Sequence, residues 1–296
     1  MNILPLDRQA AIISALCEGM SIRATERLTE THRDTIMRLG VRVGTGCVRL
    51  HSAMMIDLNV SAIQLDELWA FIGKKQRRVS PEDDATKGDC YTFIAMDQTN
   101  KAILSFQSGK RTADTTERFV ADLRKRVLGA PMISSDGFIA YEEAVRWSFK
   151  DQCQYGQIIK RVAGEPLVPA ARRYSPGHVV AVSRRAVFGS PNRSDICTSN
   201  IERQNLSVRM ASRRFTRLTN GFSKKAENHA AAVALYVAHF NLCRVHETIR
   251  TTPAMALGVT DHVWSISELT DAALHGLSEP PTEWYRRFRV IDGGRR

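Results

Sequence analysis

The sequence predicts a mixed α/β domain that follows an all-helical region. Apolar residues recur at helical spacing in residues 8–43, whereas residues 63–72 are rich in strand formers. Further along the chain, short strand-like runs alternate with amphipathic helical runs. This alternation is typical of a sheet with mixed strand directions and flanking helices. With 43% hydrophobic residues, the chain can bury a core of this kind.

Three short helices are expected near the N-terminus, over residues 8–18, 21–28 and 31–39, and the second and third begin at capping hydroxyl residues. A helix, a glycine-containing turn and a second helix outline a helix-turn-helix, whose later helix enters the DNA major groove. Arg33 and Arg38 lie on that later helix and are candidate DNA contacts. A three-helix cap without DNA contact fits the same pattern.

Five strands and four longer helices are expected after this region. The strands are placed at residues 63–72, 91–96, 102–106, 131–135 and 157–160. The second and third flank the turn-forming residues 97–100 and therefore form a hairpin. The helices are placed at residues 115–128, 139–149, 199–214 and 224–241.

A basic insertion is expected at residues 166–193, which contain no acidic residue. Residues 179–182 and 186–188 could pair within it as a small hairpin. Arg184 and Arg185 are candidate phosphate contacts, and a solvated basic loop is the alternative.

The charge balance favours a polyanionic partner. The chain has 42 Lys and Arg against 31 Asp and Glu, a formal charge of +11. No apolar run reaches the roughly 18 residues of a membrane span. The N-terminus lacks a signal-peptide pattern, and the six cysteines form no Cys-x-x-Cys pair, so we expect reduced thiols in a cytoplasmic, nucleoid-associated protein without a zinc ribbon.

Three acidic residues are candidates for catalysis and for holding metal ions: Asp66, Asp136 and Glu202. Asp66 interrupts an apolar strand, Asp136 ends a later strand, and Glu202 begins a basic helix. Cleavage of a phosphodiester by two divalent ions requires carboxylates that converge from separate elements. Each residue also has a simpler interpretation. Glu67 could be the ligand in place of Asp66, Asp136 could begin a turn, and Glu202 could form a capping box with Ser199.

The helix that carries Glu202 is unusually basic. Its candidate contacts to phosphate or to the donor DNA strand are Arg203, Asn205, Arg209, Arg213 and Arg214. His246, near the end of the following helix, is a candidate contact to DNA or to the active site, or else a packing residue.

Several blocks resemble the catalytic motifs of DDE transposases, most closely the insertion-sequence-one (IS-one) type. They are Asp-Glu-Leu-Trp at residues 66–69, Ser-Asp-Gly at 135–137 and Thr-Ser-Asn-Ile-Glu-Arg-Gln-Asn-Leu at 198–206, followed by similar segments at 213–225 and 240–253. The resemblance covers about residues 61–260. It departs from the family at the N-terminus, where members often carry a zinc ribbon.

The resemblance implies a ribonuclease-H-like five-stranded sheet, two Mg²⁺ ions that Mn²⁺ can replace, and double-stranded DNA as substrate. The DNA would be the terminal inverted repeats of a mobile element and its target, bound by a homodimer or a higher oligomer. The implied organisation is a helix-turn-helix region at 1–45, a linker at 46–60, a catalytic domain at 61–250 and a helical extension at 251–296.

Two rival functions fit many of the same residues. A ribonuclease H or repair nuclease on this fold would cleave without joining strands. An inactive helix-turn-helix regulator would bind DNA only.

Overall fold

The computed structural model describes residues 3–150, 152–163, 179–216 and 219–277. These residues form two compact units. The helical unit consists of described residues within 1–56, 70–89 and 207–296, and the sheet unit consists of described residues within 57–69 and 90–206.

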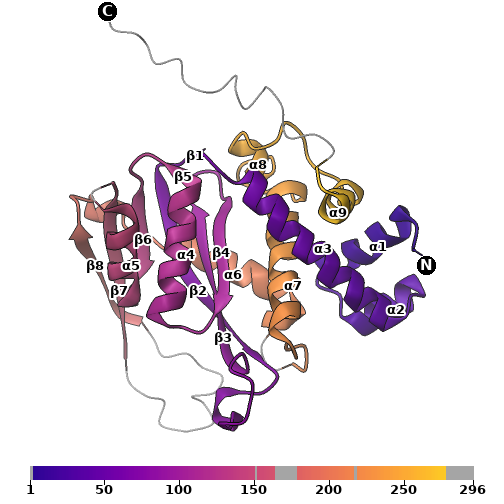
Figure 1. Cartoon of the computed structure of the whole chain (residues 1–296). Coiled ribbons are helices and arrows are strands. Elements are labelled where there is room, and N and C mark those ends of the chain that lie inside the picture. Colours follow the sequence, from indigo (N-terminus) through magenta and orange to yellow (C-terminus); the bar gives the residue numbers. More distant parts are fainter. Residues whose placement is uncertain (1–2, 151, 164–178, 217–218, 278–296) are drawn as a thin grey trace, which may run out of the picture. The chain divides into compact units, whose positions relative to one another are not determined.

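Helices and strands alternate along the chain as the sequence predicts (Figure 1). The α-helices are α1 (Leu6–Cys17), α2 (Ile22–Thr29), α3 (Arg33–Met54), α4 (Ala113–Arg126), α5 (Ala140–Phe149), α6 (Ser199–Ala211), α7 (Ala226–Ala238), α8 (Pro253–Ala256) and α9 (Ile266–His275). The strands are β1 (Leu58–Asn59), β2 (Ala62–Ile72), β3 (Gly88–Asp97), β4 (Ile103–Gly109), β5 (Val127–Leu128), β6 (Met132–Asp136), β7 (Gln154–Val162) and β8 (Val179–Phe188).

The three predicted N-terminal helices are present, but the third is longer than expected. Ser21 caps α2 through a hydrogen bond from the Ala24 backbone N–H. Helix α3 continues to Met54, so the predicted end at residue 39 is wrong, and residues 46–54 of the expected linker are helical. Glycines lower the helix propensity of this segment, but its buried face packs against α7 and α9.

Two glycines on α3 allow this close packing in the helical unit. A Cβ atom on Gly44 would lie 2.1 Å from the carbonyl oxygen of Ala231 in α7. A Cβ atom on Gly46 would lie 1.9 Å from the carbonyl oxygen of Ala273 in α9. Both contacts are with backbone, which cannot rotate away, so only glycine fits at either position.

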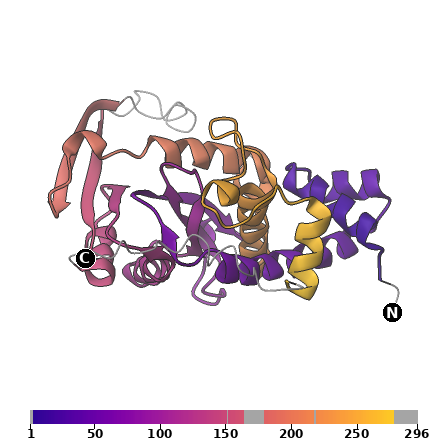
Figure 2. The ribbon, with the colours of Figure 1, turned by 90° about the horizontal axis from the view of Figure 1, so that it is seen from above.

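The sheet unit is built on a mixed six-stranded sheet in the order β4-β3-β2-β6-β7-β8. Strands β2, β6 and β7 pair in parallel, whereas the β3–β4 and β7–β8 pairs are antiparallel. Helices α4 and α5 cover one face of the sheet, and α6 begins on the other (Figure 2). Strands β2, β3, β4, β6 and β7 correspond to the five predicted strands of the mixed sheet, and β8 adds a sixth.

The predicted hairpin within residues 179–188 is wrong. These residues form one strand that pairs with β7 from Tyr155 to Val162, because a long neighbouring strand satisfies more backbone hydrogen bonds than a short local hairpin. The rest of the basic insertion, up to residue 178, lies outside the described residues. Helix α4 also ends earlier than expected, because residues 127–128 pair with β1.

The core of the sheet unit is rich in buried aromatic side chains. Tyr141, Tyr155, Phe93, Phe119 and Phe149 are all fully buried or nearly so. All six cysteines are free, as the sequence indicates, and four of them are buried. Among the described residues, no helix has both the length and the apolar character of a membrane span.

We expect Gly44→Ala to destabilise the protein, because its methyl group would push α7 away from α3. Overpacking of this kind costs about 1–3 kcal/mol. The midpoint of urea unfolding measures the effect. Gly40→Ala is the matched control, since its methyl group would meet only the mobile tip of Leu16 at 3.2 Å. Equal stability of the two variants would contradict the observed helix spacing.

Candidate active site

The parallel pairing of β2 with β6 brings two predicted acids together. Its register aligns Ala62 with Met132 and Gln64 with Ser134. Continued by two residues, this register places Asp66 level with Asp136. Adjacent strands lie about 4.8 Å apart, so the two carboxylates begin from neighbouring backbone positions.

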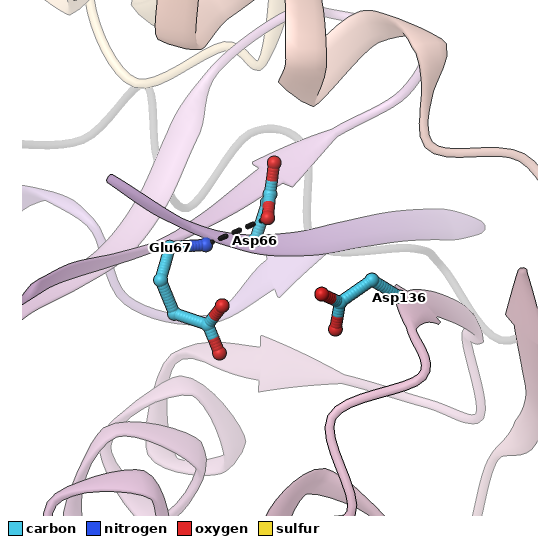
Figure 3. Close-up of side chains that lie close together, drawn as sticks. All are labelled: Asp66, Glu67 and Asp136. Atoms are coloured by element: carbon cyan, nitrogen blue, oxygen red, sulfur yellow. Dashed lines mark hydrogen bonds between the residues drawn. The ribbon is translucent and has the colours of Figure 1, made fainter. Parts of the chain in front are cut away.

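Asp66 and Glu67 point to different sides of β2, as successive strand residues do (Figure 3). Asp66 points toward α6, where Asn205 Nδ2 donates a hydrogen bond of 2.7 Å to its Oδ2. Two residues earlier on the same face, Gln64 Oε1 accepts a hydrogen bond from the Ile201 backbone N–H. These two bonds hold α6 beside Asp66.

Three carboxylates form a compact group at this place. One oxygen each from Asp66, Glu67 and Asp136 lie within 4.8 Å of one another. Oxygen ligands on opposite sides of a Mg²⁺ ion stand about 4.2 Å apart, so a small side-chain movement would bring the three onto one ion. The donor set is entirely carboxylate oxygen, which suits Mg²⁺ or Mn²⁺ better than zinc or copper.

Glu67 is buried beside Arg111 and Tyr141. Its side chain is 4% exposed, and its Oε2 lies 3.5 Å from Arg111 Nη2. The Arg111 guanidinium stacks 3.7 Å above the Phe138 ring and lies 3.8 Å from Asp136 Oδ2. Oε1 of Glu67 and the neighbouring Tyr141 hydroxyl are both buried without a well-formed hydrogen bond among the described residues. These two buried oxygens are neighbours, and the Tyr141 hydroxyl acts as a hydrogen-bond donor toward the Glu67 carboxylate.

Burial dominates the electrostatics of this group. Burial, together with the charges of Asp136 and Glu202, raises the pKa of Asp66 to about 6, against a hydrogen bond from the Glu67 backbone N–H. Burial and the charge of Asp136 likewise raise the pKa of Glu67 to about 7, although Arg111 opposes them. Desolvated carboxylates of this kind are stabilised by a bound cation.

Glu202 stands outside the compact group but close enough to affect the pKa of Asp66. Its Oε1 accepts hydrogen bonds from Lys160 Nζ at 2.5 Å and Thr198 Oγ1 at 2.6 Å. Burial acts to raise the pKa of Glu202, but these two hydrogen bonds outweigh it and lower the pKa. The Ser199 hydroxyl and backbone N–H both bond to Cys197 Sγ, and the Glu202 N–H donates to the Thr198 carbonyl oxygen, so Ser199 and Glu202 do not form a capping box.

Other predicted contacts in the sheet unit are engaged within the protein. Asn205 is 5% exposed and bonded to Asp66, so it positions that carboxylate. Arg184 donates to the Ile196 carbonyl oxygen. Arg185 pairs with Glu142 at 2.6 Å and donates to Gln157. Arg203 is exposed on α6.

The helical unit contains the remaining predicted DNA contacts. Arg214 is largely buried and donates to Ser223 Oγ, which also bonds His229 Nδ1 at 2.9 Å. His246 packs edge-on against Phe240 and accepts a hydrogen bond from the Thr248 N–H. Of the others, Arg33, Arg38 and Arg213 are exposed and Arg209 is partly buried. Their contact with DNA stays a prediction.

Three residues of the site were not predicted from the sequence: Arg111, Lys160 and Tyr141. Lys110 and Arg111 form a basic pair after β4, but nothing local distinguishes that pair from surface charge. Lys160 follows Ile158, which the β6–β7 register pairs with Asp136. Only the sheet register brings this lysine to the acidic site.

Comparisons with known proteins found structural likeness alone. Neither a family model nor a curated protein matches the sequence. The chain is similar to a piggyBac transposase synaptic complex with hairpin DNA, with a TM-score of 0.37, 11% identity and coverage of 95% of this chain and 74% of that one. It is also similar to a pre-cleavage Mos1 transpososome, with a TM-score of 0.29, 9% identity and coverage of 93% and 80%. The site residues, rather than this likeness, support the function proposed below.

We expect Glu67→Gln to stabilise the metal-free protein at pH 8 but not at pH 4. Because the folded pKa of Glu67 is raised to about 7, the native state binds more protons than the unfolded state between about pH 4 and 7. Stability therefore falls as the pH rises through this window, by roughly 1–3 kcal/mol. Urea unfolding with EDTA at several pH values between 4 and 8 measures the free energy of unfolding of the parent and the variant.

The matched control is Glu117→Gln, which removes an exposed carboxylate from α4. If Glu67→Gln and the control had parallel stability profiles from pH 4 to 8, Glu67 would not carry a raised pKa.

Proposed function

We propose that this protein is a DDE-type DNA transposase of the IS-one type, which cuts and joins DNA strands by two-metal-ion chemistry. The observation that carries the proposal is the carboxylate group of Asp66, Glu67 and Asp136 at the β2–β6 pair. The linked sequence blocks around residues 66, 136 and 202 and the charge of +11 support it.

In this proposal Asp66 and Asp136 hold the first divalent ion, and Glu202 completes a second site. Mg²⁺ fits the oxygen donors, and Mn²⁺ can replace it. Ions held by these residues would supply activation of the attacking oxygen and stabilisation of the leaving oxygen. Asn205 keeps the Asp66 carboxylate oriented through its 2.7 Å hydrogen bond. Lys160 and Thr198 both bond to Oε1 of Glu202, so Glu202 would bind an ion through Oε2 or after Lys160 releases Oε1.

The reaction has two steps that balance without another reactant. Water attacks phosphorus at the end of the element, the bond to the 3′ oxygen breaks, and a 3′ hydroxyl and a 5′ phosphate result. The 3′ hydroxyl then attacks a phosphodiester of the target, which forms one P–O bond and breaks another. Since bonds of the same kind are exchanged, joining needs no energy source.

The partners in this proposal are double-stranded terminal inverted repeats and target DNA. A synapse of two ends calls for a homodimer or a higher oligomer. The helices at residues 1–45 are proposed to contact DNA through the exposed Arg33 and Arg38 at the start of α3.

We expect the full-length protein to produce joined products from labelled inverted-repeat ends, target DNA and Mg²⁺. Asp136→Asn keeps the side-chain shape but removes a ligand charge. Loss of a group that only orients a ligand costs about 10–100-fold, so loss of the ligand itself should cost more than about 100-fold. A sequencing gel measures both products. Cleavage without joining would indicate a nuclease, and binding that is independent of metal and unaccompanied by cleavage would indicate a regulator.

A second comparison separates Glu202 from Glu67 as the third ligand. If Glu202 completes the second site, Glu202→Gln should remove one of two binding events when Mn²⁺ is titrated into the protein and followed by calorimetry. Glu67→Gln should retain both events, as should the exposed control Glu117→Gln. The reverse pattern would transfer the ligand role to Glu67, which belongs to the same carboxylate group.

A further inference from the structure

The connection between β2 and β3, residues 73–87, is an ordered loop of the helical unit, which we call the β2–β3 loop. A glycine with left-handed backbone begins this loop, and a second one follows it. Gly73 has φ of +68° and donates its N–H to the Ser223 carbonyl oxygen at 2.8 Å. Gly88 has φ of +89°, and a Cβ atom there would lie 2.2 Å from Gln76 Oε1, which accepts the Asp89 N–H.

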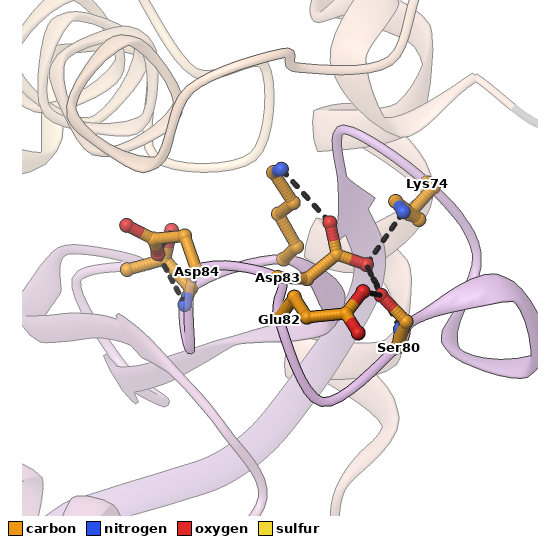
Figure 4. A network of polar contacts seen from close by, with 7 residues as sticks. Lys74, Ser80, Glu82, Asp83 and Asp84 are labelled. Carbon is orange, nitrogen blue, oxygen red and sulfur yellow. Dashed lines mark hydrogen bonds and ion pairs between the residues drawn. The ribbon is translucent and has the colours of Figure 1, made fainter.

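The carboxylate of Asp83 ties the two ends of this loop together (Figure 4). It pairs with Lys74 at 2.5 Å and with Lys87 at 3.0 Å, and it accepts the Ser80 backbone N–H at 2.8 Å. Its side chain is only 9% exposed. Hydrogen bonds from Lys74, Ser80 and Lys87 hold its pKa well below the ordinary value, so it is ionised throughout the neutral range.

This network divides the cations of the loop into two sets. Lys74 and Lys87 are neutralised by Asp83. Lys75, Arg77 and Arg78 are exposed at the short 3₁₀ turn of residues 76–78, and none of the three is paired with a carboxylate that the structure describes. The acids of the loop all follow Ser80, so the unpaired positive charge belongs to the segment before it.

An ordered set of unpaired cations is suited to a polyanion. Holding the backbone before binding reduces the entropy that binding must spend on ordering it. Each cation that neutralises a DNA phosphate releases a counterion, which strengthens binding at low salt. Three exposed cations within four residues carry no base-reading geometry, so the contact would be with the backbone rather than with sequence.

We propose that the β2–β3 loop binds the phosphate backbone of double-stranded DNA through Lys75, Arg77 and Arg78. This inference rests on the proposed function, because it takes DNA as the partner. It assigns a nucleic-acid contact to a segment outside the N-terminal helices and outside the acidic site. In this arrangement Asp83 is a positioning residue that acts through the loop backbone.

The test measures binding of a fluorescently labelled random-sequence duplex to the full chain at several salt concentrations. Arg77→Ala/Arg78→Ala should weaken binding at least about tenfold near 0.1 M salt. It should also reduce the slope of log K against log salt by about 1.8, or 0.9 for each lost phosphate contact. The matched control is Arg118→Ala/Lys125→Ala, which removes the same charge from exposed positions on α4.

Asp83→Asn provides a second variant with a different signature. It keeps both arginines but breaks the ion pairs that order the loop, and it adds one positive charge. At high salt, where that added charge is screened, affinity should therefore fall about 3–10-fold, and the salt slope should not decrease. Circular dichroism confirms that each variant is folded.

The outcomes separate the two proposals. If the parent binds and the arginine variant keeps the parent slope, or the control loses as much slope as the arginine variant, the loop is not the contact. If Asp83→Asn binds duplex as tightly as the parent, DNA binding does not depend on the ion pairs that Asp83 makes within the loop. If the parent does not bind duplex at all, the proposed function fails together with this inference.

Discussion

The parallel register between β2 and β6 is the constraint on which the candidate site depends. It places Asp66 level with Asp136, although 69 residues lie between them in the sequence. The neighbouring β6–β7 register then places Lys160 on the same edge. A slip of one residue would turn Asp66 to the opposite face of the sheet and separate it from Asn205. The strand pairing therefore determines which side chains meet at the site.

The same register brings together several carboxylates, of which Asp66 and Glu67 are buried, and two cations lie beside them. Arg111 lies between Glu67 and Asp136, and Lys160 is paired with Glu202. These pairs leave the site short of full neutralisation, since the pKa values of Asp66 and Glu67 are still raised by burial. Divalent ions would relieve this desolvation, and they would also release the two cations toward phosphate. In the proposed function, ion pairing and metal binding would therefore compete for one set of oxygens.

The helical unit follows a different physical rule, in which close backbone contact replaces charge. Gly44 and Gly46 let α3 approach α7 and α9 until backbone meets backbone. Several arginines that the sequence suggests as DNA contacts are engaged within the protein, as Arg214 is by donating to Ser223 beside His229. Within the described part of the chain, Lys75, Arg77 and Arg78 of the β2–β3 loop are exposed and are not paired with a carboxylate, in a loop whose ends Asp83 joins. Not every cation that contributes to the net positive charge of the sequence is therefore available to a polyanion.

The sequence by itself determined the alternation of helices and strands, because that pattern depends on local periodicity and turn residues. It also singled out Asp66, Asp136 and Glu202, because an acid within an apolar strand or beside a turn is unusual in its local setting. Only the tertiary structure decided that Glu67 joins the compact carboxylate group and that α3 continues past residue 39. It also decided that residues 179–188 extend the sheet. These outcomes depend on strand register and on contacts between distant helices, and neither leaves a signal in the neighbouring residues.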